Sequence, residues 1–194
     1  MSLIRWLHHL DQDATLWLNS LNTPFSDGLW QMFSDARVWI PMYVALALLL
    51  FARTGWKKAL VILASIGLTF AFTNELSDIV KSAVLRLRPV WDNYMVEGGL
   101  HRLEGRGGWY GFFSAHSANV FGLAAALTMG MRQDRSREWK GFSWMMYIWA
   151  ALVAVSRVFV GKHFLGDVLV GVAVGLAAGT LFGYLARWII GKYL

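Results

Sequence analysis

Long runs of apolar residues separated by short polar stretches organise this chain. The runs cover residues 38–52, 59–73, 117–131, 141–155 and 164–190. A helix needs about 20 mostly apolar residues to cross a hydrocarbon core of about 30 Å. Runs of this kind are therefore typical of helices that cross a bilayer. The pattern predicts an all-α, integral membrane helical bundle of five to six transmembrane helices.

Residues 1–36 follow a different pattern. Apolar residues recur there at helical spacing among His, Asp and Asn side chains, at Leu3, Trp6, Leu7, Leu10, Leu16, Trp17, Leu18 and Leu21. This is typical of an amphipathic helix that lies in a membrane interface. A break at residues 22–27 and a second short helix should follow. If residues 27–36 enter the membrane together with their neighbours, they form the sixth transmembrane helix. We expect one domain over residues 1–194, with residues 1–36 as an interfacial N-terminal region.

Composition narrows the class of protein further. Of the 194 residues, 57% are hydrophobic, which is more than a soluble domain of this size readily buries. The chain has no Cys, so disulfides and thiolate chemistry are excluded. Its net charge is +6, but no long basic run is present, so we expect the bilayer as a partner and no nucleic acid. The sequence does not indicate an oligomeric state.

Lys and Arg residues bear on which end of the bundle faces the cytoplasm. They divide nine to nine between the two ends of the predicted spans. Three of them, Lys81, Arg88 and Arg157, are candidates for chemistry, and setting these aside leaves nine against six. Because cytoplasmic loops carry an excess of Lys and Arg, residues 132–140 should be cytoplasmic. The opposite end, where the three candidates lie, should be extracytoplasmic.

Cations gather at this predicted extracytoplasmic end. Lys81 and Arg88 are seven residues apart, about two helical turns, so both can project from one helix face. Arg157 at the end of the fourth span adds a third cation. Ionisable groups at such positions are costly and indicate function, and an Arg fork with a Lys point charge suits a phosphate. Residues 114–116 begin the third span, where a helix N-terminus also attracts anions.

Two imidazoles at the same end suggest catalysis. His163 and Asp167 are four residues apart, so on a helix they share a face, and the carboxylate can fix the tautomer of the ring. The other ring nitrogen is then free to act as a nucleophile, and His116 is available to protonate a leaving oxygen. A proton relay or a structural hydrogen bond are alternatives for the His163–Asp167 pair. Zinc binding is another, but no further carboxylate or Cys cluster supports it.

These clusters resemble the motifs of the type 2 phosphatidic acid phosphatase (PAP2) superfamily. The family pattern is K-x6-R-P, then P-S-G-H, then S-R-x5-H-x3-D. This chain reads Lys81-x6-Arg88-Pro89, then Phe113-Ser114-Ala115-His116, then Ser156-Arg157-x5-His163-x3-Asp167. The match covers residues 81–167 in the correct order. Phe113 and Ala115 depart from the family pattern, which puts the shape of that loop and the substrate preference in doubt.

The resemblance implies a phosphohistidine mechanism without metal or other cofactor. His163 would attack phosphorus, Asp167 would orient it, and His116 would protonate the leaving group. The phosphoryl oxygens would be held by Lys81, Arg88, Ser114, Ala115 and Arg157. The implied location is a bacterial inner (cytoplasmic) membrane. The implied substrate is a lipid phosphomonoester or pyrophosphate: undecaprenyl pyrophosphate, phosphatidylglycerol phosphate, phosphatidic acid or a lipid A phosphate. A non-catalytic lipid-phosphate binding or transport protein on the same fold and a vanadate-dependent haloperoxidase are the alternatives.

Three further features have simpler interpretations. Glu75 and Asp78 precede Lys81 by about two turns and one turn and should pair with it or with neighbouring cations. The Gly-rich stretch 97–112 is interpreted as a solvated loop, with head-group selection as the alternative. The four-residue spacing of Gly171, Gly175 and Gly179 favours close packing of helices.

Overall fold

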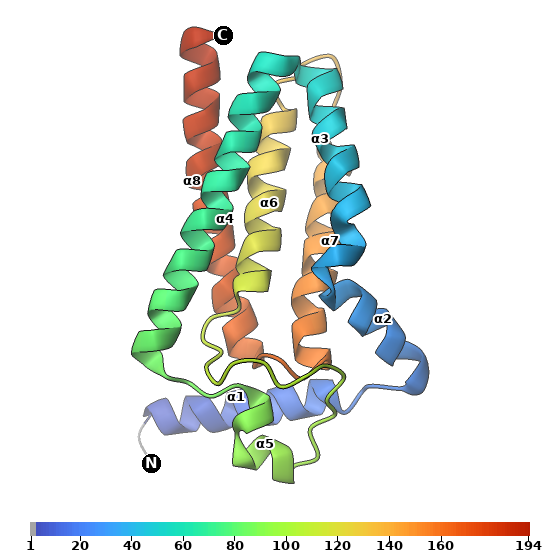
Figure 1. Ribbon diagram of the computed structural model, residues 1–194, viewed down its shortest axis with the longest axis vertical. Helices are drawn as coiled ribbons and strands as arrows, with labels where there is room; N and C mark the ends of the chain where they lie inside the picture. Colours follow the sequence, from blue (N-terminus) through green and yellow to red (C-terminus); the bar gives the residue numbers. More distant parts are fainter. Residues whose placement is uncertain (1–2) are drawn as a thin grey trace.

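Long, roughly parallel helices form a bundle that shorter helices close at one end (Figure 1). The computed structural model describes residues 3–194. Its elements in chain order are α1 Leu3–Asn19, α2 Pro24–Ser34, the 3₁₀ helix η1 Ala36–Trp39, α3 Ile40–Thr54, α4 Trp56–Val84, the 3₁₀ helix η2 Pro89–Trp91, α5 Asn93–Glu97, α6 Ala115–Met131, α7 Lys140–Phe159 and α8 Leu165–Tyr193. The predicted all-α membrane bundle is confirmed.

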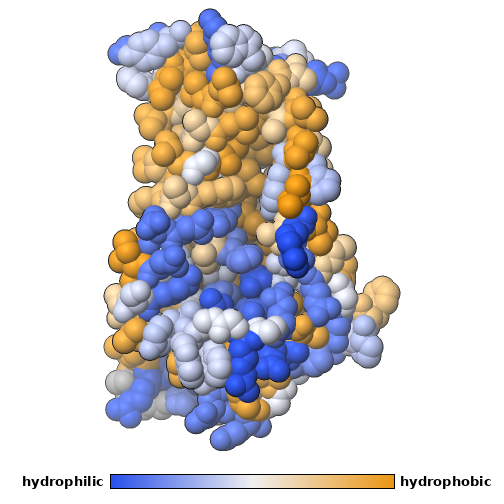
Figure 2. All heavy atoms as spheres, in the orientation of Figure 1, coloured by the Kyte–Doolittle hydropathy of each residue, from blue (hydrophilic) through white to orange (hydrophobic). Residues whose placement is uncertain are grey.

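Four helical segments among the described residues are long and apolar enough to cross a bilayer. They are residues 36–54, 56–84, 140–159 and 165–193. The remaining predicted span, the third in chain order, is α6, which has 17 residues and is about 25 Å long; most of its side chains are buried among the other long helices. Figure 2 shows that apolar side chains dominate the upper part of the bundle and hydrophilic ones the lower end.

The predicted break after the first helix is present, and α2 begins behind it. Thr23 accepts a hydrogen bond from the backbone of Ser26, whose side chain bonds back to Thr23, and Pro24 occupies the first turn. Such a capping box fixes a helix start. Since α2 ends at Ser34 after 11 residues, about 17 Å, it is too short to cross a membrane. Residues 27–36 therefore do not form a sixth span.

Glycine positions on α8 bring it close to α6. A Cβ added at Gly175 or Gly179 would collide with the carbonyl groups of Ala118 and Gly122 on α6. The glycines therefore serve packing, as their spacing predicted. One consequence is that the two helices begin side by side, and Ser114 N–H donates to the Asp167 carbonyl oxygen over 3.0 Å.

The apolar core fills the part of the bundle that lies away from α1. Leu50, Ile62, Leu127, Met131 and Met146 are buried there, where α3, α4, α6 and α7 meet. At the opposite end, buried side chains are polar or charged, among them Ser77, Ser114 and Arg157. Burying polar groups costs free energy unless they are paired, so this end of the bundle depends on hydrogen bonds and ion pairs.

Helix α1 lies across this polar end of the bundle (Figure 1). Its apolar side chains Leu3, Trp6, Leu7 and Leu10 are exposed, whereas Gln12, Thr15 and Asn19 are buried. The Asn19 amide nitrogen donates to the carbonyl oxygens of His101, Val158 and Phe159 over 2.9–3.2 Å. The polar face of α1 thus binds the protein, and the apolar side chains of its first half are exposed.

Candidate active site

Four long helices contribute ends to the polar region. The C-terminal ends of α4 and α7 and the N-terminal ends of α6 and α8 meet above α1. Because these helices alternate in direction, residues far apart in the sequence come together there. The end of the bundle therefore collects all three motif segments predicted from the sequence.

A short extended segment sets the positions of two arginines. Helix α4 ends at Val84, and the next residue, Leu85, has a left-handed backbone (φ +53°). Arg88 N–H donates to Trp109 O and Gly111 N–H donates to Arg86 O, both over 2.9 Å. Residues two apart on an extended segment point to the same side. Arg86 and Arg88 accordingly face the same turn, the one that carries His163 and Asp167.

His163 and Asp167 lie against these arginines. His163 Nδ1 is 3.5 Å from Asp167 Oδ2, and Arg88 Nη1 is 3.2 Å from His163 Nε2. Because a guanidinium only donates hydrogen bonds, Nε2 presents its lone pair and the ring proton is on Nδ1, toward the carboxylate. His163 is 2% exposed and Asp167 is fully buried. The contact of Nδ1 with the carboxylate is electrostatic, because Nδ1 makes no hydrogen bond to the described residues.

The backbone differs from the predicted one at this point. Helix α8 begins at Leu165, so His163 precedes the helix instead of sharing a helical face with Asp167. The carboxylate of Asp167 accepts a hydrogen bond from Phe164 N–H over 3.1 Å, which caps the helix start. The capping turn, which follows Gly161 at φ +76°, places the imidazole beside the carboxylate.

The electrostatics of this turn keep the imidazole neutral. Burial lowers the pKa of His163 well below its ordinary value, and the nearby charges of Arg88, Arg157 and Lys81 lower it further. Both effects disfavour the protonated ring. The free base, the form with a nucleophilic lone pair, is therefore dominant near neutral pH.

A cavity of about 360 Å³ contains most of the predicted site. Its walls include Lys81, Arg88, Ala115, His116, Arg157 and His163. Lys81 Nζ is also 3.2 Å from Asp78 Oδ1, which confirms one predicted pairing. The N-terminus of α6 opens on this cavity through Ala115 and His116, where the helix dipole favours an anion. The cavity thus offers cations, a helix N-terminus and two imidazoles to one ligand.

Two predicted site residues lie behind the cavity wall. Asp167 does not line the cavity and contacts His163 at Nδ1. Ser114 is fully buried, and its hydroxyl oxygen accepts bonds from Ser117 N–H at 3.3 Å and Ser117 Oγ at 2.9 Å. It therefore caps α6 in this structure, and its direct contact with a phosphate stays a prediction.

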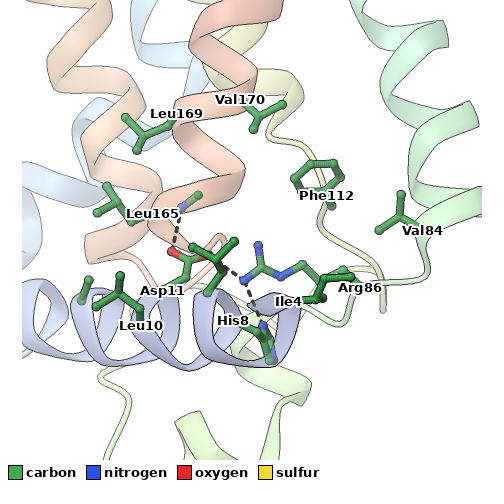
Figure 3. A pocket seen from close by; sticks show the side chains of 13 residues that line it. Ile4, His8, Leu10, Asp11, Val84, Arg86, Phe112, Leu165, Leu169 and Val170 are labelled. Atoms are coloured by element: carbon green, nitrogen blue, oxygen red, sulfur yellow. Dashed lines mark hydrogen bonds and ion pairs between the residues drawn. The ribbon is translucent and has the colours of Figure 1, made fainter. Parts of the chain in front are cut away.

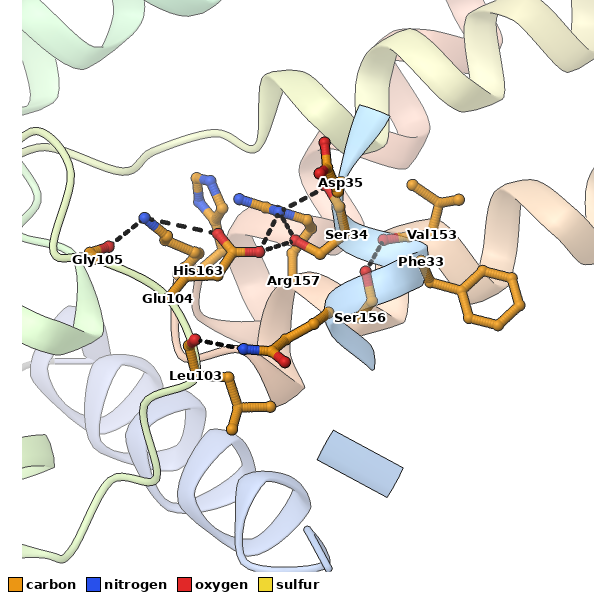
Figure 4. Close-up of polar contacts among 12 residues, drawn as sticks. Phe33, Ser34, Asp35, Leu103, Glu104, Gly105, Val153, Ser156, Arg157 and His163 are labelled. Atoms are coloured by element: carbon orange, nitrogen blue, oxygen red, sulfur yellow. Dashed lines mark hydrogen bonds and ion pairs between the residues drawn. The ribbon is translucent and has the colours of Figure 1, made fainter. Parts of the chain in front are cut away.

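The Gly-rich loop is more than the solvated connection that its composition indicated. Glu104 lies 3.6 Å from Arg157 Nη1 and 3.7 Å from Lys162 Nζ, and the Ser34 hydroxyl donates to it. Figure 4 shows this cluster, with Arg157 also bonded to Ser34. Sequence reasoning gave Glu104 a role only through the alternative of head-group selection by this loop, and gave none to Ser34 or Lys162. Only the chemistry of a buried Arg157, which needs a counter-charge, could have indicated Glu104.

Arg86 is the other residue that sequence reasoning missed. Its Nη1 donates to Asp167 Oδ1 over 2.8 Å and its Nη2 to Asp11 Oδ2 over 2.6 Å. Asp11 Oδ1 also accepts from Gly166 N–H over 2.8 Å. Arg86 thus lies between α1 and α8, beside an apolar groove that these helices form (Figure 3). The R-x-R spacing of Arg86 and Arg88 was the available signal.

Metal binding has no support from the arrangement of ligands. Among residues 3–194, no group of three or more His, Cys, Asp or Glu side chains could hold a metal ion. The carboxylates near the cavity instead bind cationic side chains: Asp167 binds Arg86, and Glu104 contacts Arg157 and Lys162.

Comparison with known proteins identifies relatives along most of the chain. The profile of the PAP2 superfamily matches residues 56–190. A protein of Bacteroides thetaiotaomicron named "Lipid A 4'-phosphatase" is 31% identical over 187 residues, covering 95% of this chain and 80% of its own length. A protein of the same name from Porphyromonas gingivalis is 29% identical over 177 residues, covering 91% of this chain and 72% of its own.

Two crystal structures share the fold. One is a transmembrane PAP2-type phosphatidylglycerolphosphate phosphatase from Bacillus subtilis, with a TM-score of 0.68, 19% identity, and coverage of 97% of this chain and 88% of that one. The other is LpxE of Aquifex aeolicus, with a TM-score of 0.64 and 20% identity. The match covers 88% of this chain and 92% of that one. At these identities the likeness concerns the arrangement of helices alone.

Proposed function

Since this chain belongs to the PAP2 superfamily, we propose that it hydrolyses a lipid phosphomonoester or pyrophosphate through a phosphohistidine intermediate. The coarser statement follows from its relatives: it is a membrane lipid phosphatase, a phosphoric ester hydrolase. The proposal adds the course of the reaction and the choice of substrate.

The reaction has two steps. In the first, the lone pair of His163 Nε2 forms a bond to phosphorus while the bond from phosphorus to the ester oxygen breaks, and His116 gives a proton to that oxygen. In the second, a water oxygen forms a bond to phosphorus while the bond from phosphorus to His163 Nε2 breaks, and His116 takes a proton from that water. This releases inorganic phosphate and restores both imidazoles. Lys81, Arg88 and Arg157 are placed to stabilise the charge on the phosphoryl oxygens, which is the main demand of phosphoryl transfer.

The observation that carries this proposal is the orientation of His163. Its Nε2, which accepts from Arg88, lies on the wall of a cavity lined by four cations, while its Nδ1 is 3.5 Å from the buried carboxylate of Asp167. A protein that only bound or transported lipid phosphates would need the cations, but not a buried imidazole oriented by a carboxylate. The observation therefore supports catalysis over binding.

Among the four candidate lipids we favour a lipid A phosphate. Two curated relatives named for lipid A 4'-phosphatase activity align with more than nine-tenths of this chain. The phosphatidylglycerolphosphate phosphatase is similar at 19% identity only. No relative reported above is named for undecaprenyl pyrophosphate.

A phosphate-release panel tests the proposed function. Purified protein in detergent is given lipid A, phosphatidic acid, phosphatidylglycerol phosphate and undecaprenyl pyrophosphate, each with and without EDTA. We expect the highest kcat/KM on lipid A and equal rates with the chelator. A higher kcat/KM on another lipid would refute the substrate, and loss of activity in EDTA would refute the metal-free mechanism.

We also propose how the protein sits in a bacterial inner membrane. The exposed apolar face of α1 would lie in the extracytoplasmic membrane surface, with the catalytic end of the bundle on that side. The charge bias of the loops supports this orientation, and a substrate anchored in the bilayer would be concentrated at such a site. The described chain would then be one domain with α1 and α2 as its interfacial region.

Single-cysteine labelling tests this orientation, because the natural chain has no Cys. A Cβ at Gly108 has open space around it, so Gly108→Cys should fold normally. In intact spheroplasts we expect a membrane-impermeant maleimide to label Gly108→Cys, whereas Arg135→Cys, in the loop at the opposite end, should react only after permeabilisation. The reverse pattern would place the catalytic end in the cytoplasm.

The acid limb of the pH profile reports on the nucleophile. An ordinary His becomes protonated as the pH falls through about 6.5. Because the pKa of His163 is lowered, its free base persists below that pH. We expect the acid limb of kcat/KM to lie below that value. Lys81→Met removes one cause of the lowered pKa and should move the limb to higher pH.

The pH profile of kcat/KM has to be compared between wild type and Lys81→Met because the phosphate of the substrate also titrates. A phosphomonoester has a second pKa near about 6, which is common to wild type and variant. Only the difference between their profiles therefore reports on the imidazole. A limb that stays in place or moves to lower pH in Lys81→Met would contradict the electrostatic account.

A further inference from the structure

A second polar cavity adjoins the catalytic one. It measures about 580 Å³ and shares His116, Arg157 and Lys162 with the catalytic cavity. Its remaining walls come from the end of α2, from η1 and from the loop, namely Gln31, Ser34, Asp35, Ala36, Arg37, Glu104 and Gly105. Figure 4 shows part of this wall around Ser34 and Glu104. The reaction described above does not use this cavity.

The charges of this cavity argue against a second phosphate. Asp35 binds Arg37 through two bonds of 2.9–3.0 Å, and Glu104 lies between Arg157 and Lys162. Three Lys or Arg side chains on its wall thus face two carboxylates, whereas the catalytic cavity has four against Asp78 alone. A ligand here meets many hydrogen-bonding groups but little excess positive charge, which suits a neutral, hydroxyl-bearing group.

The composition of the wall argues against an acyl chain. Ala36 and Gly105 are the smallest contributors, and no large aliphatic or aromatic side chain lines this cavity. The groove between α1 and α8 differs from this cavity because its lining is largely apolar and includes Leu7, Leu165 and Leu169. A polar cavity of this size is in the range that binds small molecules, and it exceeds what a glycerol unit would fill.

The direction of the reaction connects this cavity to the leaving group. In phosphoryl transfer the attacking and leaving atoms lie roughly in line on opposite sides of phosphorus. His163 lines only the catalytic cavity, whereas His116 lines both. If His116 protonates the leaving oxygen, the group attached to that oxygen extends past His116 into the second cavity.

We propose that this second cavity binds a sugar ring, the head group that carries the scissile phosphate. The inference rests on the proposed roles of His163 and His116. Amide, carboxylate and guanidinium groups from Gln31, Asp35 and Arg37 are placed on the wall to bond its hydroxyls. The cavity then selects lipids whose phosphate is on a sugar over lipids whose phosphate is on glycerol.

Filling the cavity tests this selection. Ala36 is exposed and on the wall, so Ala36→Phe occupies the cavity without replacing a residue of the proposed catalytic machinery. The matched control is Ala45→Phe on the exposed side of α3. Each protein is assayed for kcat/KM on a phosphoglycolipid and on phosphatidic acid, and for inhibition by inorganic phosphate.

We expect wild type and Ala45→Phe to prefer the phosphoglycolipid. Ala36→Phe should lower kcat/KM on that lipid about ten-fold, with phosphatidic acid cleavage and the Ki of inorganic phosphate unchanged.

If Ala36→Phe does not fold, Arg37→Ala is the second variant, because the Arg37 side chain is 85% exposed in the native protein. It should reduce the ratio of kcat/KM on the phosphoglycolipid to kcat/KM on phosphatidic acid. Equal losses on both lipids, no loss, or a wild-type preference for phosphatidic acid would each overturn the sugar site. Absence of phosphate release from either lipid would instead refute the proposed function.

Discussion

Replacing His163 by alanine is expected to reduce phosphate release by more than about 10⁴-fold, to the level of a protein-free blank. Loss of a covalent nucleophile removes the reaction pathway itself, and such losses are among the largest known for single residues. His163 Nε2 lies on the cavity wall, where it accepts from Arg88, and none of the other groups that line the cavity is a buried, neutral imidazole beside a carboxylate. The measurement is kcat on the preferred lipid, with thermal unfolding in detergent to confirm the fold.

His116→Ala is the matched comparison for this experiment. A general acid contributes about 10²–10⁴-fold, so this variant should keep more activity than His163→Ala. It should also recover on an aryl phosphate, whose leaving group needs no proton, whereas His163→Ala should not. A His163→Ala protein with wild-type rates, or one that an aryl phosphate restores, would show that the nucleophile is misassigned.

The membrane bundle could be predicted from the sequence because lipid restricts the possible folds. A segment in hydrocarbon must satisfy its backbone hydrogen bonds internally, which leaves helices for apolar runs of this length. The motif spacings then placed Lys81, Arg88, His116, Arg157 and His163 at one end, and they do line one cavity. Periodicity also indicated α1, because its apolar positions recur at helical spacing.

The parts that sequence reasoning missed depend on tertiary contacts of loops. Whether Glu104 contacts solvent or Arg157 is decided by the path of residues 98–113, which have little regular structure of their own. The extended pairing of residues 86–88 with residues 109–111 likewise has no local signal. Ser114 could serve a ligand or a helix cap, and spacing alone does not distinguish the two.

Arg86 gives rise to the second large expected effect, this time on stability as well as activity. Its guanidinium bonds the fully buried carboxylate of Asp167 and the carboxylate of Asp11, and is itself only 17% exposed. Arg86→Met would leave Asp167 buried without its cation. Removing one partner of a buried ion pair costs about 3–5 kcal/mol, so we expect a loss of unfolding free energy of that size.

Activity should fall in parallel, because Arg86 positions the carboxylate that orients His163. We expect kcat to decrease about 10–100-fold, as for other groups that act through a catalytic residue. Arg86→Lys keeps the charge but offers a single ammonium to two carboxylates, so it should recover only part of the loss. Lys140→Met is the surface control: its pair with Glu138 is 82% exposed on both sides and should be worth less than about 1 kcal/mol.

A double variant separates the effect on stability from the effect on catalysis. In Arg86→Met with Asp167→Asn, the fully buried charge is removed together with its cation, and only Asp11, 16% exposed, stays without Arg86. Unfolding free energy should therefore return part of the way toward the wild-type value. Activity should stay low, because an amide holds neither the tautomer nor the developing charge of His163 as a carboxylate does. If stability does not recover, the cost of Arg86→Met comes from lost packing against Phe164, whose ring lies 4.1 Å from the guanidinium carbon, and not from the charge of Asp167.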